Sequence, residues 1–182
     1  LSIATIDGSV SGPLTIRGLV YRDADAGIEL TVDRLQIDLA LLALWRRSVV
    51  IEAGAADGVR LHLTEPRDPP DDKPLSFEAP IAVEIRAFEL RDGVVSRHGE
   101  ALVDIKSAHL QAVWSGDTLA IQRLDLDARQ GEVQLAGSVA GAKPYRGQLR
   151  GNFVWRQADQ PWAGSLSADA AGAQVAAVVR LQ

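Results

Sequence analysis

Residues 9–35 read SVSGPLTIRGLVYRDADAGIELTVDRL, and apolar and polar side chains alternate along this stretch, with breaks at glycines and at an Asp-rich turn. Successive side chains of a β-strand point to opposite faces, so the alternation predicts strands with one apolar and one polar face. The same pattern continues to the end of the chain. Because antiparallel sheets alternate in this way and parallel sheets are buried on both faces, the sequence predicts an all-β, mostly antiparallel protein.

Short turn signals separate the predicted strands: DGSVSG, DADAG, AADG, RDG, SGD, RQGE, AGAKP and DAAGA. Glycine supplies the positive φ that tight hairpins need, and aspartate favours turns by bonding its own backbone. Because these connections are short, we expect consecutive strands to be neighbours in the sheet, as a meander of roughly a dozen or more strands.

Two segments depart from the alternation. ALLALWRR (residues 40–47) has apolar residues at helical spacing and ends in two arginines, which suit a helix C-terminus. We expect a short amphipathic helix there, which either packs on the sheet as a plug or contacts a membrane or a partner. EPRDPPDDKP (residues 65–74) contains prolines that a central strand excludes. We therefore divide the chain into a first unit (1–64, with the short helix), a Pro-rich loop (65–76) and a second unit (77–182) that continues the first.

Composition excludes several classes of protein. Of the 182 residues, 47 % are hydrophobic and 24 % are charged, and the net charge is −5, which argues against binding to nucleic acid phosphates. No run of about 18 apolar residues is present that would span a bilayer. Cysteine is absent, which excludes disulfides and thiolate metal sites, and so is methionine. We expect the chain to be a piece of a longer protein, with any signal or anchor segment outside it.

Residues typical of catalysis or metal binding do not occur in the required patterns. The three histidines lack the spacing of metal ligands, and no nucleophile elbow or phosphate-binding glycine loop is present. Asp23, Asp25 and Gly27 begin like a calcium loop, but the further oxygen ligands and the distal glutamate are missing. We therefore predict no enzyme activity, no metal site and no cofactor.

The remaining feature is one consistently apolar face. It either closes against a second sheet as a sandwich core or bends into an open trough. Aromatic residues make up only 5 % of the chain, and the inward residues are mostly aliphatic, which favours a trough whose inner face suits an acyl chain. We predict that this groove is lined by Leu30, Val32, Leu61, Leu63, Ile81, Val83, Ile85, Val103, Ile105, Ile121, Val133, Leu135, Leu149, Phe153, Leu166 and Val179.

Most of the chain resembles the TamB family of AsmA-like Gram-negative envelope proteins. The stretch IDGSVSGPLTIRGLVYRDADAGIELTVDRLQIDLALLALWRRSVVIEAGAADGVRLHL is similar to the region just after the N-terminal anchor of that family. The later stretch FELRDGVVSRHGEALVDIKSAHLQAVWSGDTLAIQRLDLDARQGEVQLAGSV resembles the family's repeating unit, with its tryptophan, turn, strand, strand, glycine order. The matching steps fall on Gly8, Gly12, Leu14–Leu19, Tyr21, Ile28–Leu39, Leu44, Trp45, Val49–Ile51 and Gly58–Leu63, and then on Trp114, Gly116, Leu119–Ile121, Leu124–Leu126 and Gly131–Gly137.

The resemblance implies a fold and a function. Members of the family are anchored in the inner membrane and cross the periplasm as a curved β-groove, a β-taco, that carries phospholipid acyl chains toward the outer membrane. The resemblance also implies pairing with TamA, an outer-membrane BamA-like barrel, through a region outside this chain. We expect a periplasmic fragment anchored by a segment that is absent here.

Two other functions stay open. One is a chaperone-like role in translocation and assembly of outer-membrane barrel proteins or autotransporters, in which exposed strand edges pair with unfolded segments. The other is a structural sandwich domain without a ligand. An unpaired edge strand also leads us to expect edge-to-edge self-association of the fragment.

Overall fold

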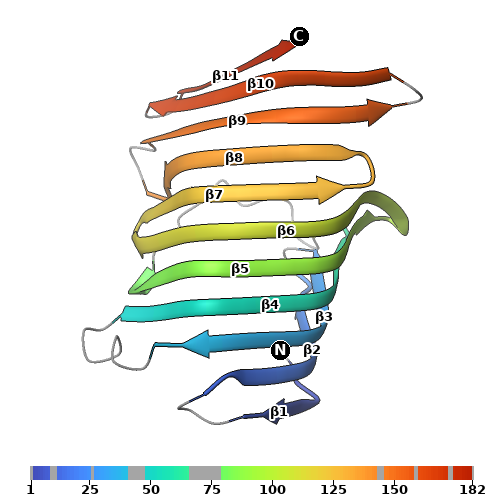
Figure 1. Ribbon diagram of the computed structural model, residues 1–182, viewed down its shortest axis with the longest axis vertical. Coiled ribbons are helices and arrows are strands. Elements are labelled where there is room, and N and C mark those ends of the chain that lie inside the picture. The colour runs from blue at the N-terminus through green and yellow to red at the C-terminus, as the bar shows by residue number, and fades with distance from the viewer. Residues whose placement is uncertain are drawn as a thin grey trace.

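The computed structural model describes residues 2–8, 12–25, 27–40, 48–65, 79–142, 146–157, 160–171 and 174–181, and these form one sheet of eleven strands in chain order (Figure 1). No helix occurs in these residues. The all-β prediction and the expectation that consecutive strands are neighbours are both confirmed. The strands are β1 (Thr5–Asp7), β2 (Leu14–Asp23), β3 (Ile28–Leu39), β4 (Ser48–Leu63), β5 (Ala79–Arg97), β6 (Glu100–Gly116), β7 (Thr118–Ala128), β8 (Gly131–Ala140), β9 (Arg146–Gln157), β10 (Gln160–Ala171) and β11 (Gln174–Leu181).

The two predicted interruptions fall almost entirely outside the described residues. Of the helix predicted for residues 40–47, only Ala40 is described, and its backbone N–H donates to the carbonyl of Val50 at 2.9 Å. Of the Pro-rich loop, only Glu65 is described.

One strand pair departs from the expected meander. β4 and β5 run parallel, whereas every other neighbouring pair in the sheet is antiparallel. A parallel pair needs a connection that returns the chain to the end of the sheet from which the first strand started. The sheet therefore consists of two antiparallel meanders, β1–β4 and β5–β11, that lie side by side through the parallel β4–β5 pair.

Two of the predicted turns, AADG and RDG, are wrong. Both sequences lie inside long strands, β4 and β5, at a line of irregular residues that crosses the sheet. This line takes one residue from each of β2 to β6, and these residues lie opposite one another without being assigned as pairs. They are Gly18, Asp33, Gly58, Asp92 and Lys106. Gly18, Gly58 and Asp92 have positive φ values of 62°, 67° and 54°.

This line of extra residues preserves the apolar face. An unpaired residue in a strand restarts the side-chain alternation, so apolar residues on its two sides can point to the same face although their spacing in sequence is odd. In β3, for example, Val32 and Leu35 are three residues apart and yet pair with Val59 and Ala56 of β4 in one continuous register. Glycine and aspartate suit these unpaired positions, because they tolerate the left-handed backbone that elsewhere makes a turn.

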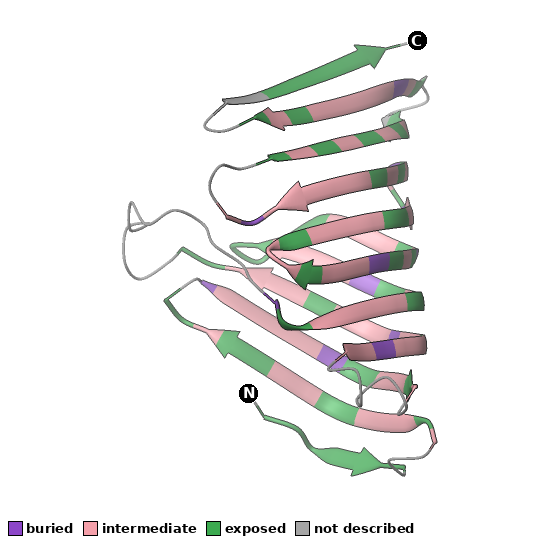
Figure 2. Ribbon diagram, turned by 90° about the vertical axis from the view of Figure 1, so that its left-hand side faces the viewer, coloured by how far each residue is buried: buried purple, intermediate pink, exposed green. Residues whose placement is uncertain are grey.

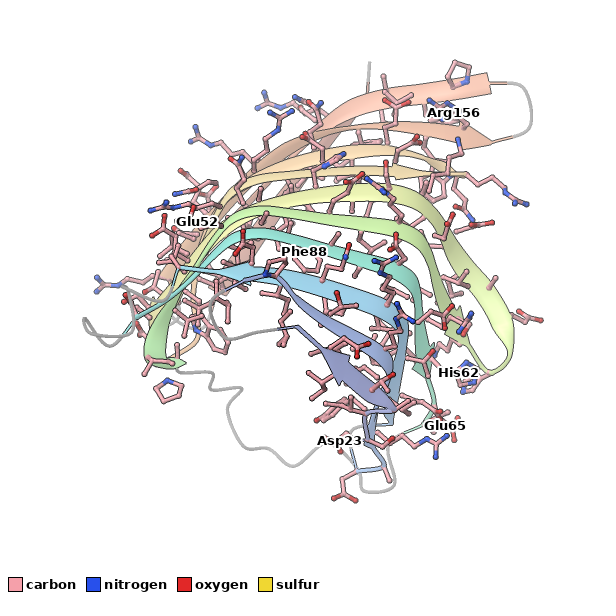
Figure 3. All side chains as sticks on the ribbon, turned by 60° about the horizontal axis from the view of Figure 1, so that its bottom comes forward. Asp23, Glu52, His62, Glu65, Phe88 and Arg156 are labelled. Carbon is pink, nitrogen blue, oxygen red and sulfur yellow. The ribbon has the colours of Figure 1, made fainter. Side chains whose placement is uncertain are left out.

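The sheet is open and curved. Figure 2 shows a single sheet of strands, and Figure 3 shows the strands bending as an arch. Substantial packing between strands is confined to neighbours in the sheet. In Figure 3 the side chain of Phe88 lies beneath the arch, whereas Glu52, His62 and Arg156 lie on its outer side.

Substitution of Gly58 by alanine tests the line of unpaired residues that crosses β2 to β6. A Cβ at this position would meet the Asp33 carboxylate oxygen at 2.2 Å, and Asp33 is held by Arg60 through bonds of 3.0 and 2.8 Å. We expect Gly58→Ala to lower the free energy of unfolding in urea by about 2–3 kcal/mol, since left-handed strain adds to the lost ion pair.

The matched control is Gly116→Ala in the β6–β7 turn, where φ is 56° and no atom lies within 4 Å of an added Cβ. There only the backbone strain of about 1–2 kcal/mol applies. Equal losses for the two variants would contradict the contact between Gly58 and Asp33.

Candidate functional site

The register of the sheet aligns one row of side chains across ten strands. Residues that pair directly across neighbouring strands point to the same face. The central row contains no polar side chain, and its members, one from each of β2 to β11, are Leu14, Ile37, Gly54, Phe88, Leu110, Leu124, Leu135, Gly151, Leu166 and Val179.

Two flanking rows are equally apolar. Together with the central row they define what we call the apolar face. One consists of Ile16, Leu35, Ala56, Leu90, Ala108, Leu126, Val133, Phe153, Gly164 and Leu181. The other consists of Leu39, Ile51, Ile85, Ala112, Ile121, Gly137, Leu149, Ala168 and Ala177.

The residues predicted to line the groove, with the exception of Ile81, lie on this one side of the sheet. Leu135, Leu166 and Val179 belong to the central row, and Ile85, Ile121, Val133, Leu149 and Phe153 belong to the flanking rows. The apolar face continues toward one end of the strands in three further steps: Val32 and Ile105, then Leu30, Leu61 and Val103, and finally Leu63. Toward the other end it continues through Val83. Ile81 lies two residues before Val83 at a register shift, has no assigned partner in β6, and is 42 % exposed.

Sequence reasoning missed the middle of β5. Phe88 and Leu90 lie in the two most continuous rows, but the RDG that follows them was interpreted as a turn. The alternation in AFELRDG is the signal that identifies them. The Phe88 ring covers the backbone of Gly54 on β4, where an added Cβ would meet Cδ2 of the ring at 2.5 Å. A phenylalanine over a neighbouring glycine fills the space that the missing side chain leaves.

The apolar face is only partly shielded from water. Within the described residues no second sheet or helix covers it, and no large side chain there is fully buried. Trp155 is 40 % exposed, and exposure rises to 50 % at Trp162 and 63 % at Val179 near the C-terminal edge. The buried apolar residues are small or medium-sized: Val32, Val50, Ala56, Ala79, Ala108, Ala112 and Ala128.

The opposite side of the sheet, which we call the polar face, carries ion pairs. Arg86 donates to Glu52 at 2.7 and 2.8 Å and to Glu84 at 2.9 Å, and these hydrogen bonds, with that to Glu84 the stronger cause, raise the pKa of Arg86. Arg91 donates to Glu89 at 2.8 and 2.6 Å, which lowers the pKa of the Glu89 carboxyl and raises that of Arg91. Exposed pairs of this kind contribute little stability, but they keep one face of the sheet hydrated.

The part of the chain that the structure describes shows no group of three or more His, Cys, Asp or Glu side chains placed to hold a metal ion. His62 instead shares a hydrogen bond with the Ser96 hydroxyl at 2.7 Å between β4 and β5. No helix in the described ranges is long and apolar enough to cross a membrane.

Comparisons with known proteins identify one family. The sequence model of the family described as TamB, N-terminal domain, matches residues 1–102. This range covers β1 to β5 and the first residues of β6. A search of the curated proteins and a search of the solved structures each found no match.

Replacement of Phe88 by alanine tests how open the apolar face is. A fully buried phenylalanine costs about 3–5 kcal/mol when it is truncated to alanine. Because Phe88 is only half-buried, we expect Phe88→Ala to lower the free energy of unfolding in urea by about 1–2 kcal/mol. Phe88→Leu, which still covers Gly54, is the control and should cost less. A loss above about 4 kcal/mol for Phe88→Ala would indicate a closed core instead.

Proposed function

Because the chain belongs to the TamB family, we propose that it is a periplasmic segment of an envelope protein of the TamB/AsmA type. In this proposal the apolar face lines a groove that carries phospholipid acyl chains toward the outer membrane. A segment outside this chain anchors the protein in the inner membrane, and a further region, also outside it, meets the outer-membrane barrel TamA. The segment needs neither a cofactor nor a catalytic residue for this task.

The uninterrupted central row is the observation on which the proposal rests. Ten strands spaced about 4.8 Å apart give a row about 40 Å long. A single acyl chain spans half of a bilayer core of about 30 Å, or about 15 Å. The row therefore offers an acyl chain many equivalent positions, and it contains no polar side chain that would hold the chain at one of them.

In this proposal the acyl tails of a phospholipid lie on the apolar face, and its headgroup stays in water. Acyl tails gain dispersion contacts on an aliphatic surface and need no hydrogen bonds. A headgroup keeps its hydration where the face is open to water, and the exposure of Trp162 and Val179 indicates such an opening near β10 and β11. Shallow and uniform binding along the face suits a conduit better than a storage site.

A second function is favoured by the edge strand β11. Among the strands that the structure describes, β11 pairs with β10 alone, and its Val178 and Leu181 are 47 % and 58 % exposed. In this second proposal an edge strand of the sheet accepts another strand, either from a second copy of the chain or from an unfolded outer-membrane barrel segment. Strand peptides, and not lipid, would then be the ligand.

Charges placed on the apolar face test the conduit. We expect Val133→Asp in the full-length protein to abolish its support of outer-membrane phospholipid supply, because a carboxylate facing hydrocarbon costs several kcal/mol. The circular dichroism spectrum and melting temperature of this 182-residue chain should stay near normal, because a charge on an open face reaches water. Radiolabelled phospholipid transfer between the two membranes is the readout.

The control is Gln134→Lys, at the adjacent residue of β8, whose side chain points to the polar face opposite Asp125. It should alter neither folding nor lipid transfer. Unfolding of Val133→Asp would favour a closed core, whereas normal folding with normal transfer would contradict a conduit at this part of the sheet.

A further inference from the structure

The polar face contains a hollow that the lipid proposal does not use. It has a volume of about 760 Å³ and extends over β3 to β7. Its floor consists of Ala53, Ala55 and Ala87, which we call the alanine floor. Ala55 pairs with Gln36 and Glu89, and Ala53 pairs with Asp38, so these positions belong to the polar face. The short methyl groups leave space above the backbone here, between the longer side chains of Gln36, Asp38 and Glu89.

Charged groups surround the alanine floor unevenly. Glu89, His109 and Asp125 lie in one directly paired row across β5, β6 and β7. Glu89 is held by Arg91, and Asp125 accepts a hydrogen bond from Arg123. Asp38, at the β3 side of the hollow, has no hydrogen bond or ion pair through its side chain among the described residues. Arg123 and His109 also line the hollow, so among the described residues Asp38 is the lining carboxylate that has no cationic partner.

Free amide groups complete the rim. The side chains of Gln36 and Gln111 line the hollow and make no hydrogen bond within the described ranges. A carboxamide offers both donors and an acceptor, which matches the alternating N–H and C=O groups of a peptide backbone. From β3 to β7 the hollow spans four strand spacings, about 19 Å, which corresponds to an extended segment of about five or six residues.

We propose that this hollow binds a short basic peptide segment of a partner protein. Apolar side chains of the peptide lie on the alanine floor, a Lys or Arg side chain pairs with Asp38, and the peptide backbone bonds to Gln36 and Gln111. A floor formed by an open sheet, without walls that enclose a whole molecule, fits a peptide better than a small ligand. Because the hollow lies on the face opposite the acyl-chain rows, a partner can dock there while lipid occupies the other side.

Alanine-methyl NMR of the 182-residue chain separates the two faces directly. The probe is the peptide acetyl-Leu-Arg-Leu-Arg-Leu-amide, and its neutral counterpart contains citrulline in place of arginine. We expect saturable shifts of the Ala53, Ala55 and Ala87 methyl signals, while Ala56 and Ala112 on the apolar face stay unchanged. The citrulline peptide should bind about tenfold more weakly, because it loses the charge-assisted bond to Asp38.

Variants of the chain sharpen the test. Asp38→Asn should weaken binding of the arginine peptide about as much as citrulline does, and Ala55→Leu should abolish it by filling the floor. Asp169→Asn, which removes one carboxylate from the polar face outside the hollow, is the matched control and should have no effect.

Shifts confined to Ala56 and Ala112, equal affinity for both peptides, or no saturable shift would each overturn the proposal. None of these outcomes bears on lipid transfer by Val133→Asp, so a failure here and a failure of the conduit are distinguishable.

Discussion

The structure depends on the register in which neighbouring strands pair. A single-layer sheet has no second layer to define its interior, so the direction of each side chain is set only by how its strand pairs with its neighbours. A slip of one residue in one strand would move that strand's leucines and valines to the polar face. The central row keeps register through ten strands, including the parallel β4–β5 pair, where Gly54 lies opposite Phe88.

The stability of such a sheet comes from contacts between neighbouring strands and not from a buried core. Cross-strand pairs on the apolar face each contribute roughly 0.2–1 kcal/mol, and many small terms add up along the rows. The Phe88 ring over Gly54 and the Phe153 ring over Gly164 are local examples of this packing. The face can therefore stay partly open and still hold its shape, which is the property that a surface for mobile acyl chains requires.

The line of unpaired residues from Gly18 to Lys106 explains how long strands restart their alternation without losing their apolar face. Each of β2 to β6 has one unpaired residue at the same level, so the register between these strands is the same on both sides of this line. The opposite face has its own irregularity, because the short side chains of the alanine floor leave a hollow beside Gln36, Asp38 and Glu89. The two faces thus support two independent proposals, one for lipid and one for a peptide.

Much of this architecture follows from period-two alternation. The all-β class, the order of the strands and the common face of residues such as Leu135 and Val133 could be predicted, because each depends on local pattern and short connections. The interpretation of AADG and RDG as turns was wrong because glycine and aspartate favour both hairpin turns and left-handed residues within a strand. Only the pairing with distant strands distinguishes the two cases. The alanine floor was missed for a related reason: Ala53 and Ala87 are 34 residues apart, and only the parallel pairing of β4 and β5 brings them together.

Photo-crosslinking in cells tests the central claim most directly. A photoreactive residue is placed in the full-length protein at Ile105, Leu135 or Leu149, and at the adjacent positions Asp104, Gln134 or Gln148, and the adducts are identified by mass spectrometry. We predict phospholipid adducts at the first three positions and none at the second three, since adjacent strand residues face opposite sides. Equal lipid capture at both sets, or capture of protein strands and no lipid at Leu135, would contradict an acyl-chain conduit on the apolar face.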